Sequence, residues 1–511
     1  MLLFELVQTS ATVASTRSRS AKAAALATLL GQLTPDEVEP AVALLTGRPR
    51  QGKIGVGWGL LRSIDHPPVA SPSLEVLELD AAISSLQSLA GTGSRTARLE
   101  LLERLITRAT PAEADFIRRL LVGDLRQGAQ EGVMAEAVSK ASGVDLVAVR
   151  RAVMLAGDLP QVASIALTNG ETGVSAIGLE VLRPILPMLA SSSEDVASAL
   201  GDLGTCAVEW KLDGARIQAH RAGDEVRLYT RNLNDVTARL PAVVDVLREL
   251  DVDQVVLDGE VLGVTEDAPD PFQDTMSSFG RRTGPPGPAS LGVWFFDCLH
   301  LDGHDLLDRP LVERSAVLDR LALARVPSTV TDDVGAAVAV QTQALAAGHE
   351  GVMVKAASSA YEAGRRGAAW RKVKPVHTLD LVVLAAEWGS GRRRGWLSNL
   401  HLGARDPEGG YVMVGKTFKG LTDALLEWQT GEILARESAR HGHVVEIVPP
   451  LVVEIALDGV QASTRYPGGV ALRFARVRRY RGDKDPHEAD TIDAVRALLP
   501  RGGRSGAPAA R

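Results

Sequence analysis

The sequence predicts a multidomain fold: an all-α N-terminal domain, a central α+β domain built on antiparallel sheets, and a small C-terminal β-barrel. Three observations predict this order. The chain has 511 residues, more than one hydrophobic core normally supports. Helix-start signals dominate its first part, whereas short β-branched runs begin near residue 205 and change in character near Val376. The expected domains are residues 1–195, 196–375 and 376–500, and residues 501–511 are expected to form a disordered tail.

The first domain is expected to be helical because its helix starts are well marked. Thr34 can cap a helix, Pro35 occupies the first helical position, and Glu37 completes a capping box. The same device recurs at residues 110–113. Between these starts, apolar side chains spaced along residues 96–107 form one face of an amphipathic helix. We see no repeat of fixed period, so a solenoid is not expected.

The central domain is expected to contain strands because β-branched residues alternate with turn signals. The strand-like runs are residues 206–220, 225–232, 254–264, 291–303, 350–356 and 368–375. Helical segments at residues 238–250 and 312–324 separate some of them. Strands mixed with helices in this way are typical of an α+β domain with antiparallel sheets.

The C-terminal domain is expected to be a small barrel. Its strand-like runs are residues 380–406, 411–418, 444–459 and 470–482. One helix is expected between them, over residues 422–438. The junction with the central domain, and a hinge, are expected near Pro375.

Composition excludes several classes of protein. A hydrophobic fraction of 45% and a charged fraction of 23% are those of a globular protein. No stretch approaches the roughly 20 apolar residues that span a bilayer, and the N-terminus lacks the order of a secretory signal, so a cytoplasmic location is expected. Cys206 and Cys298 are the only cysteines, and their number and spacing predict neither a disulfide framework nor a metal site built from cysteines. The net charge of −7 argues only weakly against a polyanionic partner, because an average hides patches.

A set of lysines and carboxylates suggests phosphate chemistry. Lys211, in "EWKLDGAR", can be a nucleophile when its amine is neutral. Further lysines and two carboxylates lie in strand-like runs that can project into one cleft. These are Lys355, Lys372, Lys374, Glu260 and Glu350. Carboxylate oxygens are ligands for Mg²⁺ and lysines neutralise phosphate oxygens, so such a cleft can bind a metal and a polyphosphate.

Each of these residues also has an ordinary structural interpretation. Lys211 can be a solvated strand residue, Glu260 can belong to a hairpin, and "EGVMVK" can be an edge strand protected by its charges. The residues alone leave these alternatives open. Their joint occurrence in one order along the chain favours the chemical interpretation.

That ordered set resembles the ATP-dependent DNA ligases of the covalent nucleotidyltransferase superfamily, of the bacterial, actinobacterial type. The resemblance covers nearly the whole chain and rests on "EWKLDGAR", "LYTRN", "LDGEVL", "WFFDCLHLDG", "EGVMVK", "WRKVKP" and "LRFARVRRYRGDK". It implies a helical DNA-binding domain, a nucleotidyltransferase (adenylation) domain and an OB-fold. It also implies three reactions: Lys211 takes AMP from ATP and releases pyrophosphate, the AMP passes to the 5′-phosphate of a nick, and the 3′-hydroxyl displaces AMP.

The resemblance assigns roles to individual residues. Glu209 would accept a hydrogen bond from the adenine amino group, and Phe296 would stack on the base. Arg216 and Arg231 would contact ribose or phosphate, with Arg231 at the 5′-phosphate of the nick. Lys355, Lys372 and Lys374 would bind the AMP phosphate. The ligands of the metal would be Glu260, Glu350 and Asp213, with Glu260 also placed to hold the ribose hydroxyl and Gly214 shaping the turn.

The last motif and three further regions complete the expectations. The residues expected to orient the leaving pyrophosphate are Arg476, Arg479, Arg481, Asp483 and Lys484, of which Arg481 and Lys484 are the main candidates for binding nucleotide. Because they lie in the last domain, that domain must close over the nucleotide and then swing away. Contacts to the DNA backbone are expected at Arg126, Arg392, Arg393 and Arg394.

The implied partners are nicked duplex DNA and ATP, with Mg²⁺ as the metal and Mn²⁺ as an alternative. The protein is expected to be a monomer that binds no membrane and acts at the bacterial nucleoid in repair, replication or recombination. An RNA ligase or a capping-type guanylyltransferase shares the lysine chemistry, but the long helical region argues against both. A non-catalytic nick-binding scaffold is disfavoured because Lys211, Glu260, Glu350, Lys372 and Lys374 are all present.

Overall fold

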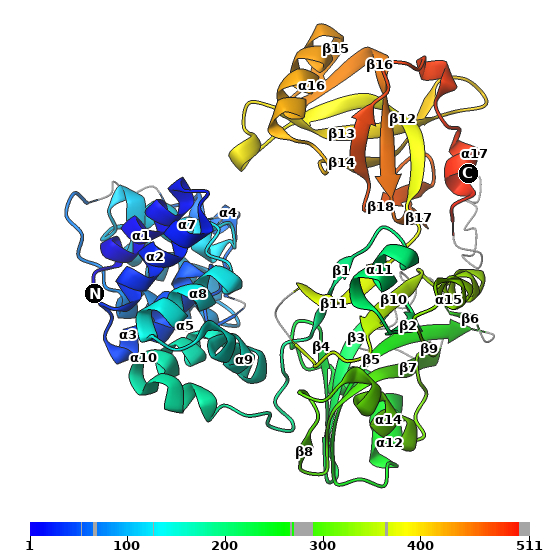
Figure 1. Ribbon diagram of the computed structural model, residues 1–511. Coiled ribbons are helices and arrows are strands. Elements are labelled where there is room, and N and C mark those ends of the chain that lie inside the picture. Colours follow the sequence, from blue (N-terminus) through cyan, green and yellow to red (C-terminus); the bar gives the residue numbers. More distant parts are fainter. Residues whose placement is uncertain are drawn as a thin grey trace.

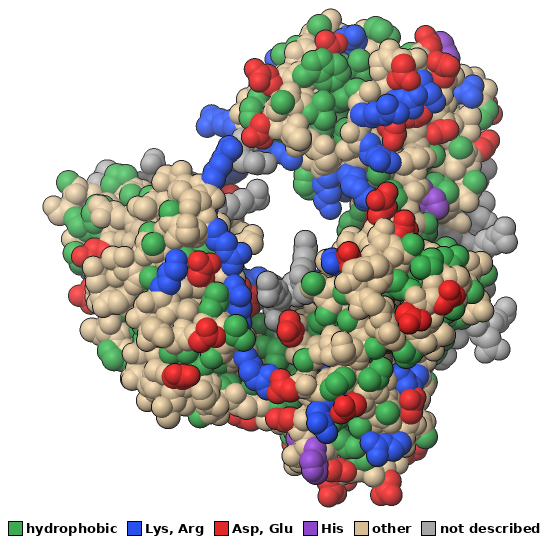
Figure 2. All heavy atoms as spheres, in the orientation of Figure 1, with side chains coloured by type: hydrophobic (Ala, Val, Ile, Leu, Met, Phe, Trp, Pro, Cys, Tyr) green, Lys and Arg blue, Asp and Glu red, His purple; other side chains and the backbone are tan. Residues whose placement is uncertain are grey.

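The chain forms three lobes that surround a central opening in the computed structural model (Figures 1 and 2). The structure describes residues 1–52, 54–64, 69–125, 127–265, 268–269, 290–362 and 366–499. The helical lobe and the C-terminal lobe approach each other where Arg17 Nη2 lies 4.0 Å from Asp423 Oδ2. The expected tail, residues 501–511, lies outside the described residues.

The first lobe is built from helices alone. They are α1 (Leu3–Ser15), α2 (Arg19–Leu30), α3 (Pro35–Leu45), α4 (Trp58–Leu61), α5 (Val76–Ser88), α6 (Ser94–Ile106), α7 (Pro111–Leu121), α8 (Glu131–Ser142), α9 (Leu146–Ala156) and α10 (Leu159–Ser175), which is kinked at Gly170. The capping boxes expected at Thr34 and Thr110 are both present, at the starts of α3 and α7. Leucine and valine side chains from α1 to α10 share one hydrophobic core.

The central lobe contains two sheets. Its elements are β1 (Leu189–Ser192), α11 (Val196–Leu203), β2 (Cys206–Trp210), β3 (Ala215–Ala222), β4 (Glu225–Thr230), η1 (Thr237–Arg239), α12 (Pro241–Arg248), β5 (Gln254–Thr265), β6 (Ala268–Pro269), β7 (Ser290–Leu301), β8 (His304–Asp305), α14 (Leu311–Arg320), β9 (Ser328–Thr331), α15 (Val334–Ala346), β10 (Val352–Ala356) and β11 (Arg366–Val373). One sheet has the order β1-β11-β10-β2-β9. The other has the order β4-β3-β5-β7-β8, with β6 paired to β5.

Helices cover the outer face of each sheet, which leaves the two inner faces for the site. Helices α11 and α15 pack on the first sheet in one apolar cluster. Helices α12 and α14 pack on the second sheet in another. A further cluster, with Tyr361 and Trp370 at its centre, lies between the sheets and includes Met154 and Leu155 of α9. The central and helical lobes therefore share buried apolar surface.

The structure differs from the sequence expectations at two places in this lobe. Strand β2 ends at Trp210, so Lys211 follows the strand, and the turn after it leads into β3 of the other sheet. Strand β1 pairs in parallel with β11, so the first sheet already begins before residue 196, the expected boundary. Local sequence patterns do not reveal the pairing of a four-residue strand with a parallel partner that lies far along the chain.

The C-terminal lobe is a curled antiparallel half-barrel of OB type, so the expected fold class is confirmed. Its elements are β12 (His377–Trp388), η2 (Gly391–Arg393), β13 (Leu397–Arg405), β14 (Tyr411–Thr417), α16 (Asp423–Ala435), β15 (Glu437–His441), β16 (Val444–Leu457), β17 (Gly459–Ala462), β18 (Val470–Arg473), β19 (Arg476–Tyr480), η3 (Pro486–Glu488) and α17 (Ile492–Arg496). The main sheet has the order β14-β13-β12-β16-β15, with β19 also paired to β16, and β17 and β18 form a hairpin. Only residues 374–376 separate β11 from β12. Among the described helices, none has the length and apolar character needed to cross a membrane.

Candidate active site

The first sheet presents lysines and a carboxylate on its inner face. Glu209 of β2, Met353 of β10 and Lys372 of β11 are register partners across three neighbouring strands. The next row contains Lys355 and its partner Trp370. Because side chains in a strand alternate between faces, both rows point to the same side. The residue types singled out from the sequence therefore converge on one surface.

The second sheet supplies the opposite wall. Arg216 of β3 is paired with Glu260 of β5, and Gln218 is paired with Asp258. These four side chains lie on the face of the second sheet that is turned toward the first, since Ile217 packs instead against the helices of the outer face. The cleft between the sheets is thus lined by charged groups from both.

Lys211 lies at the end of this cleft, where its backbone is fixed to the segment before β10. Its N–H donates to the carbonyl of Gly351 at 2.9 Å, and its own carbonyl accepts from the N–H of Glu350 at 3.1 Å. Its Nζ lies 2.5 Å from Glu350 Oε2, and its side chain remains 22% exposed. Lys374 Nζ lies 2.5 Å from the other oxygen of Glu350. The nucleophile candidate is therefore held in place yet accessible from solvent.

The two lysines determine the charge of Glu350. Burial raises the pKa of this carboxyl, but the ammonium groups of Lys211 and Lys374 more than compensate, so its pKa lies below the ordinary value. Glu350 is consequently an anion placed between two cations.

The turn after Lys211 contacts the C-terminal lobe. Arg473 at the end of β18 places Nη1 2.8 Å from Asp213 Oδ2 and Nη2 3.9 Å from Glu350 Oε1. The neighbouring Gly214 is required sterically, because a Cβ atom there would collide with the carbonyl oxygen of Val261. Sequence reasoning missed Arg473. Its only signal was its place at the start of the cationic run "RFARVRRYRGDK".

Glu260 is a buried carboxyl with a raised pKa. Burial raises its pKa to about 7, although Lys211 and Arg216 act in the opposite direction and the N–H of Gly214 donates a hydrogen bond to it. Near neutral pH both protonation states are therefore populated in the free protein.

This shift predicts a pH-dependent stability in the metal-free protein. Between the ordinary pKa of 4.5 and the folded pKa of about 7, Glu260 carries a proton in the folded state and has lost it in the unfolded state. The free energy of unfolding should therefore fall as pH rises through this window, by up to about 1.4 kcal/mol per pH unit. Urea unfolding in EDTA measures the slope. We expect Glu260→Gln, which does not titrate, to flatten it, and an equally steep slope in the variant would contradict the assignment.

Glu209 and Lys355 form a buried ion pair. Lys355 Nζ lies 2.5 Å from Glu209 Oε2, and the two side chains are 2% and 3% exposed. The same ammonium lies 4.4 Å from the centre of the Phe296 ring and 4.3 Å from that of Trp370. Burial raises the pKa of Glu209, which Lys355 only partly offsets. Among the described residues, Glu209 Oε1 is buried without a hydrogen-bond partner, a costly state that a bound donor would relieve.

The lysines expected at the AMP phosphate therefore occupy different places. Lys374 lies beside Glu350 and Lys211, and Lys372 lies in the row of Glu209. Lys355 instead lies one row deeper, against Glu209 and the aromatic rings. Strand alternation fixes these positions.

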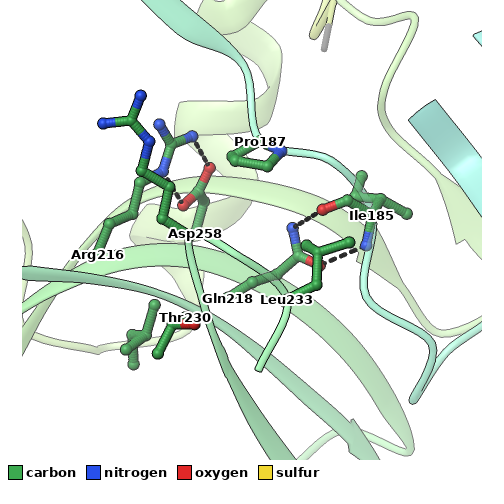
Figure 3. Close-up of a pocket in the computed structure, with 9 residues that line it drawn as sticks. Ile185, Pro187, Arg216, Gln218, Thr230, Leu233 and Asp258 are labelled. Carbon is green, nitrogen blue, oxygen red and sulfur yellow. Dashed lines mark hydrogen bonds and ion pairs between the residues drawn. The ribbon is translucent and has the colours of Figure 1, made fainter. Parts of the chain in front are cut away.

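Arg216 of β3 and Arg231, which follows the end of β4, line a small pocket, and Figure 3 labels Arg216 in it. Nε and Nη2 of Arg216 donate to the two carboxylate oxygens of Asp258 at 2.9 and 2.5 Å. Its Nη1 donates to the carbonyl of Met188 at 2.7 Å. Tyr361 donates to the same carboxylate at 2.7 Å. Arg231 is exposed and lines the pocket with Arg216 and Asp258. Asp258 and Tyr361 were not singled out from the sequence, although Asp258 lies in the motif "LDGEVL".

The residues of the last motif that were expected to orient pyrophosphate lie away from the cleft. In the part of the chain that the structure describes, their ion pairs all stay within the C-terminal lobe. The pairs are Arg476 with Asp458, Arg479 with Glu454, Arg481 with Asp380 and Asp483, and Lys484 with Asp380. The structure brings Arg473 to the cleft instead.

The residues expected to contact the DNA backbone are only partly described. Arg393 donates to the carbonyl of Phe418 and lies over its ring, while Arg394 is exposed. Arg126 and the side chain of Arg392 lie outside the described residues. Figure 2 shows Lys and Arg side chains on the edges of the opening.

The expected metal ligands are carboxylates, which suit Mg²⁺, but the described residues do not by themselves enclose an ion. Asp213, Glu260 and Glu350 offer carboxylate oxygens in one cleft, which fit Mg²⁺. Within the described ranges, no group of three or more acidic, His or Cys residues is close enough to enclose an ion. This fits a metal held by one or two carboxylates and completed by phosphate oxygens and water, as is common for Mg²⁺.

Comparisons with known proteins identify the family of the chain. Models described as "DNA ligase N terminus", "ATP dependent DNA ligase domain" and "ATP dependent DNA ligase C terminal region" match residues 62–139, 187–374 and 393–484. The "Probable DNA ligase" of Saccharopolyspora erythraea is 57% identical over 501 residues, which cover 98% of each chain. That of Rhodococcus jostii is 55% identical over 504 residues, covering 98% of this chain and 100% of the relative.

A solved structure named "Pmar-Lig_PreS3" has the same fold. It covers 93% of this chain and 99% of its own length with a TM-score of 0.64, at 19% sequence identity. The three family models follow one another along the chain, and the relatives match it over almost their full lengths. The chain therefore belongs to the family of ATP-dependent DNA ligases.

Proposed function

We propose that Lys211 is the residue that accepts AMP in this DNA ligase. The observation that carries the proposal is its Nζ, accessible at the end of the cleft and 2.5 Å from a carboxylate that Lys374 also holds. Attack requires the neutral amine, so Nζ must first lose a proton to the solvent that reaches it, while Glu350 remains an anion. The bond from Nζ to the α-phosphorus forms while the bond to pyrophosphate breaks. Positioning and charge neutralisation then dominate the rate.

Glu209 and Phe296 provide the adenine site in this proposal. The free, buried Oε1 of Glu209 accepts a hydrogen bond from the amino group of adenine, and guanine has a carbonyl oxygen at that position. A guanine there leaves two acceptors facing each other without a proton, which selects strongly against GTP. Phe296 lies at the same end of the cleft, beside Lys355.

The remaining charged residues handle phosphate and metal. Lys372 and Lys374 bind the AMP phosphate, and Arg231 with Arg216 receives the 5′-phosphate of the nick. Glu260 and Glu350 would hold Mg²⁺, or Mn²⁺ in its place, with Asp213 as a further ligand when Arg473 is withdrawn. The metal supplies positive charge that neutralises the phosphate oxygens. The opening between the lobes receives the nicked duplex, and Arg393 and Arg394 contact the DNA backbone.

The C-terminal lobe serves two steps in this proposal with two different faces, one that carries Arg473 and one that carries Arg481 and Lys484. The described arrangement, with Arg473 on Asp213, is the one that seals DNA. Self-adenylation requires Arg481 and Lys484 to reach the leaving pyrophosphate, so the lobe must turn about residues 374–376. The boundaries 1–195, 196–375 and 376–500 describe the parts that move, although β1 belongs with the second. We further propose that the protein acts as a monomer at the bacterial nucleoid.

This model predicts opposite effects for two arginines of one lobe. Arg473→Ala should slow the sealing of a nick that already carries AMP by about tenfold and spare self-adenylation. The reason is that it removes the ion pair with Asp213, which belongs only to the proposed sealing arrangement. Arg481→Ala should slow self-adenylation by a similar factor and spare sealing. Single-turnover assays of the two steps measure this, with the exposed Arg440→Ala as the matched control. Equal loss of both steps in either variant would contradict the two-face model.

The proposed function is tested most directly by intact-protein mass spectrometry. The protein is first treated with pyrophosphate to remove any AMP acquired during purification, and is then incubated with Mg²⁺ and either ATP or GTP. A gain of one AMP from ATP, lost when nicked duplex is added and sealed, supports the proposal. A gain of GMP from GTP would favour a capping-type guanylyltransferase. No gain from either nucleotide would favour a non-catalytic scaffold.

A further inference from the structure

The linker between α10 and β1 is fastened to the inner face of the second sheet by side chains. The N–H of Leu182 donates to Nδ1 of His220 at 3.1 Å. The N–H of Ile185 donates to Oε1 of Gln218 at 2.8 Å, and Nε2 of Gln218 donates back to the carbonyl of Ile185 at 3.3 Å. Figure 3 shows this reciprocal pair. These contacts use backbone atoms of the linker, so they do not depend on which side chains the linker carries.

Three of the residues that hold the linker alternate along one strand. Arg216, Gln218 and His220 follow one another at intervals of two on β3, so they lie on one face. Arg216 completes the series by donating to the carbonyl of Met188 at 2.7 Å. One end of the series, Arg216, lines the pocket that contains Arg231, and the other end holds the linker where it leaves the helical lobe.

His220 has one defined tautomer in this arrangement. Because Nδ1 accepts from Leu182, the ring proton lies on Nε2, which donates to Oε1 of Gln218 at 2.9 Å. Burial lowers the pKa of His220 to about 3, with a smaller contribution from His300, so the ring is neutral at physiological pH. The two side chains act as a unit, since Oε1 of Gln218 accepts from both the linker and the histidine.

The linker is also joined to the helical lobe. The N–H of Leu186 donates to the carbonyl of Met154 in α9 at 2.9 Å. Met154 and Leu155 are buried in the same apolar cluster as Ile185, Met188 and Trp370. Leu182 has a φ of 73°, a left-handed conformation that a leucine disfavours, so the linker requires outside contacts to keep this shape.

The same linker forms part of the phosphate pocket. Ile185 and Pro187 line the pocket together with Arg216, Arg231 and Asp258. A displacement of the linker therefore changes the pocket directly, and it also moves the carbonyl of Met188 that Arg216 holds. The helical lobe and the candidate site for the 5′-phosphate are joined through a few residues of backbone.

We propose that Gln218 and His220 are positioning residues for the DNA-dependent steps: by fixing the backbone of residues 182–187, they align the helical lobe on DNA with the pocket of Arg216 and Arg231. This inference rests on the proposed role of that pocket in binding the 5′-phosphate. It assigns the two residues to the transfer of AMP from protein to DNA and to sealing, and not to the reaction of Lys211 with ATP.

Two substitutions of His220 separate its contacts. In His220→Asn, the amide oxygen lies where Nδ1 was and can accept from Leu182. In His220→Gln, the amide nitrogen lies where Nε2 was, so the contact with Gln218 is kept and that with the linker is lost. We expect His220→Gln to slow the transfer of AMP from adenylated protein to a nick by about tenfold, with self-adenylation within about twofold of wild type. His220→Asn should restore most of the DNA-dependent rate.

A third variant and a control complete the experiment. Gln218→Met removes both linker hydrogen bonds at similar volume and should behave like His220→Gln, which keeps the test available if either variant fails to fold. Arg151→Ala removes an exposed ion pair between the helical lobe and Asp308 and should change neither step. Equal slowing of both steps, or failure of His220→Asn to differ from His220→Gln, would overturn the proposal. If wild-type protein does not adenylate itself from ATP, the proposed function fails instead.

Discussion

Lys211→Arg should abolish self-adenylation while leaving the sealing of a pre-adenylated nick measurable. The guanidinium keeps a positive charge opposite Glu350, so the ion pair and the local fold are retained. It remains protonated at all accessible pH values and is not a nucleophile. We expect the rate of AMP transfer from ATP to fall by about 10⁴-fold or more, as for other removed nucleophiles. Mass spectrometry after incubation with ATP measures the loss.

The sealing assay shows that the variant is folded. It supplies a nick that already carries AMP, a substrate on which no lysine nucleophile is needed. Lys140→Arg, on the exposed surface of α8, is the matched control and should label at the wild-type rate. A Lys211→Arg protein that still gains AMP would show that another residue is the acceptor.

Breaking the buried pair of Glu209 and Lys355 should strongly destabilise the fold. Glu209→Leu leaves the ammonium of Lys355 buried without its carboxylate, and we expect a loss of about 3–5 kcal/mol in the free energy of unfolding. Lys355→Met should cost a similar amount for the converse reason. The double variant Glu209→Leu/Lys355→Met buries no unpaired charge and should regain most of the loss. Urea unfolding of the four proteins measures the coupling.

The double variant also separates stability from selectivity. Without the free Oε1 of Glu209, the site no longer distinguishes the amino group of adenine from the carbonyl of guanine. We expect the preference for ATP over GTP in self-adenylation to fall by at least about tenfold even where the fold is restored. A double variant that keeps the wild-type preference would place the base elsewhere in the cleft.

Local signals explain what the sequence predicted. The capping boxes at Thr34 and Thr110 start α3 and α7, and the β-branched runs became β4, β5 and β7, because caps and strand patterns depend on neighbouring residues. The half-barrel and the three-lobe order followed from the same kind of pattern. The convergence of Lys211, Glu350 and Lys374 was expected only through the resemblance, since spacing does not show which strands meet.

What the sequence did not reveal depends on contacts between distant segments. Arg473 reaches Asp213 from another lobe, and Gln218 and His220 hold a linker more than 30 residues away. Lys355 lies in a strand-like run of the sequence, as Lys372 and Lys374 do. The register of β10 against β2 nevertheless places it beside Glu209. Such partners are set by how sheets and lobes pack, and no nearby residue encodes them.

The short connection between β11 and β12 limits what one molecule can do at a time. Residues 374–376 tie the C-terminal lobe so closely to the cleft that Arg473 and Arg481 compete for it at high effective concentration, whatever the protein concentration. If each arginine serves its proposed step, a single ligase alternates strictly between loading AMP and joining DNA. A molecule engaged on a nick is then shielded from reloading, so abundant ATP has no access to a site that is already committed to joining DNA.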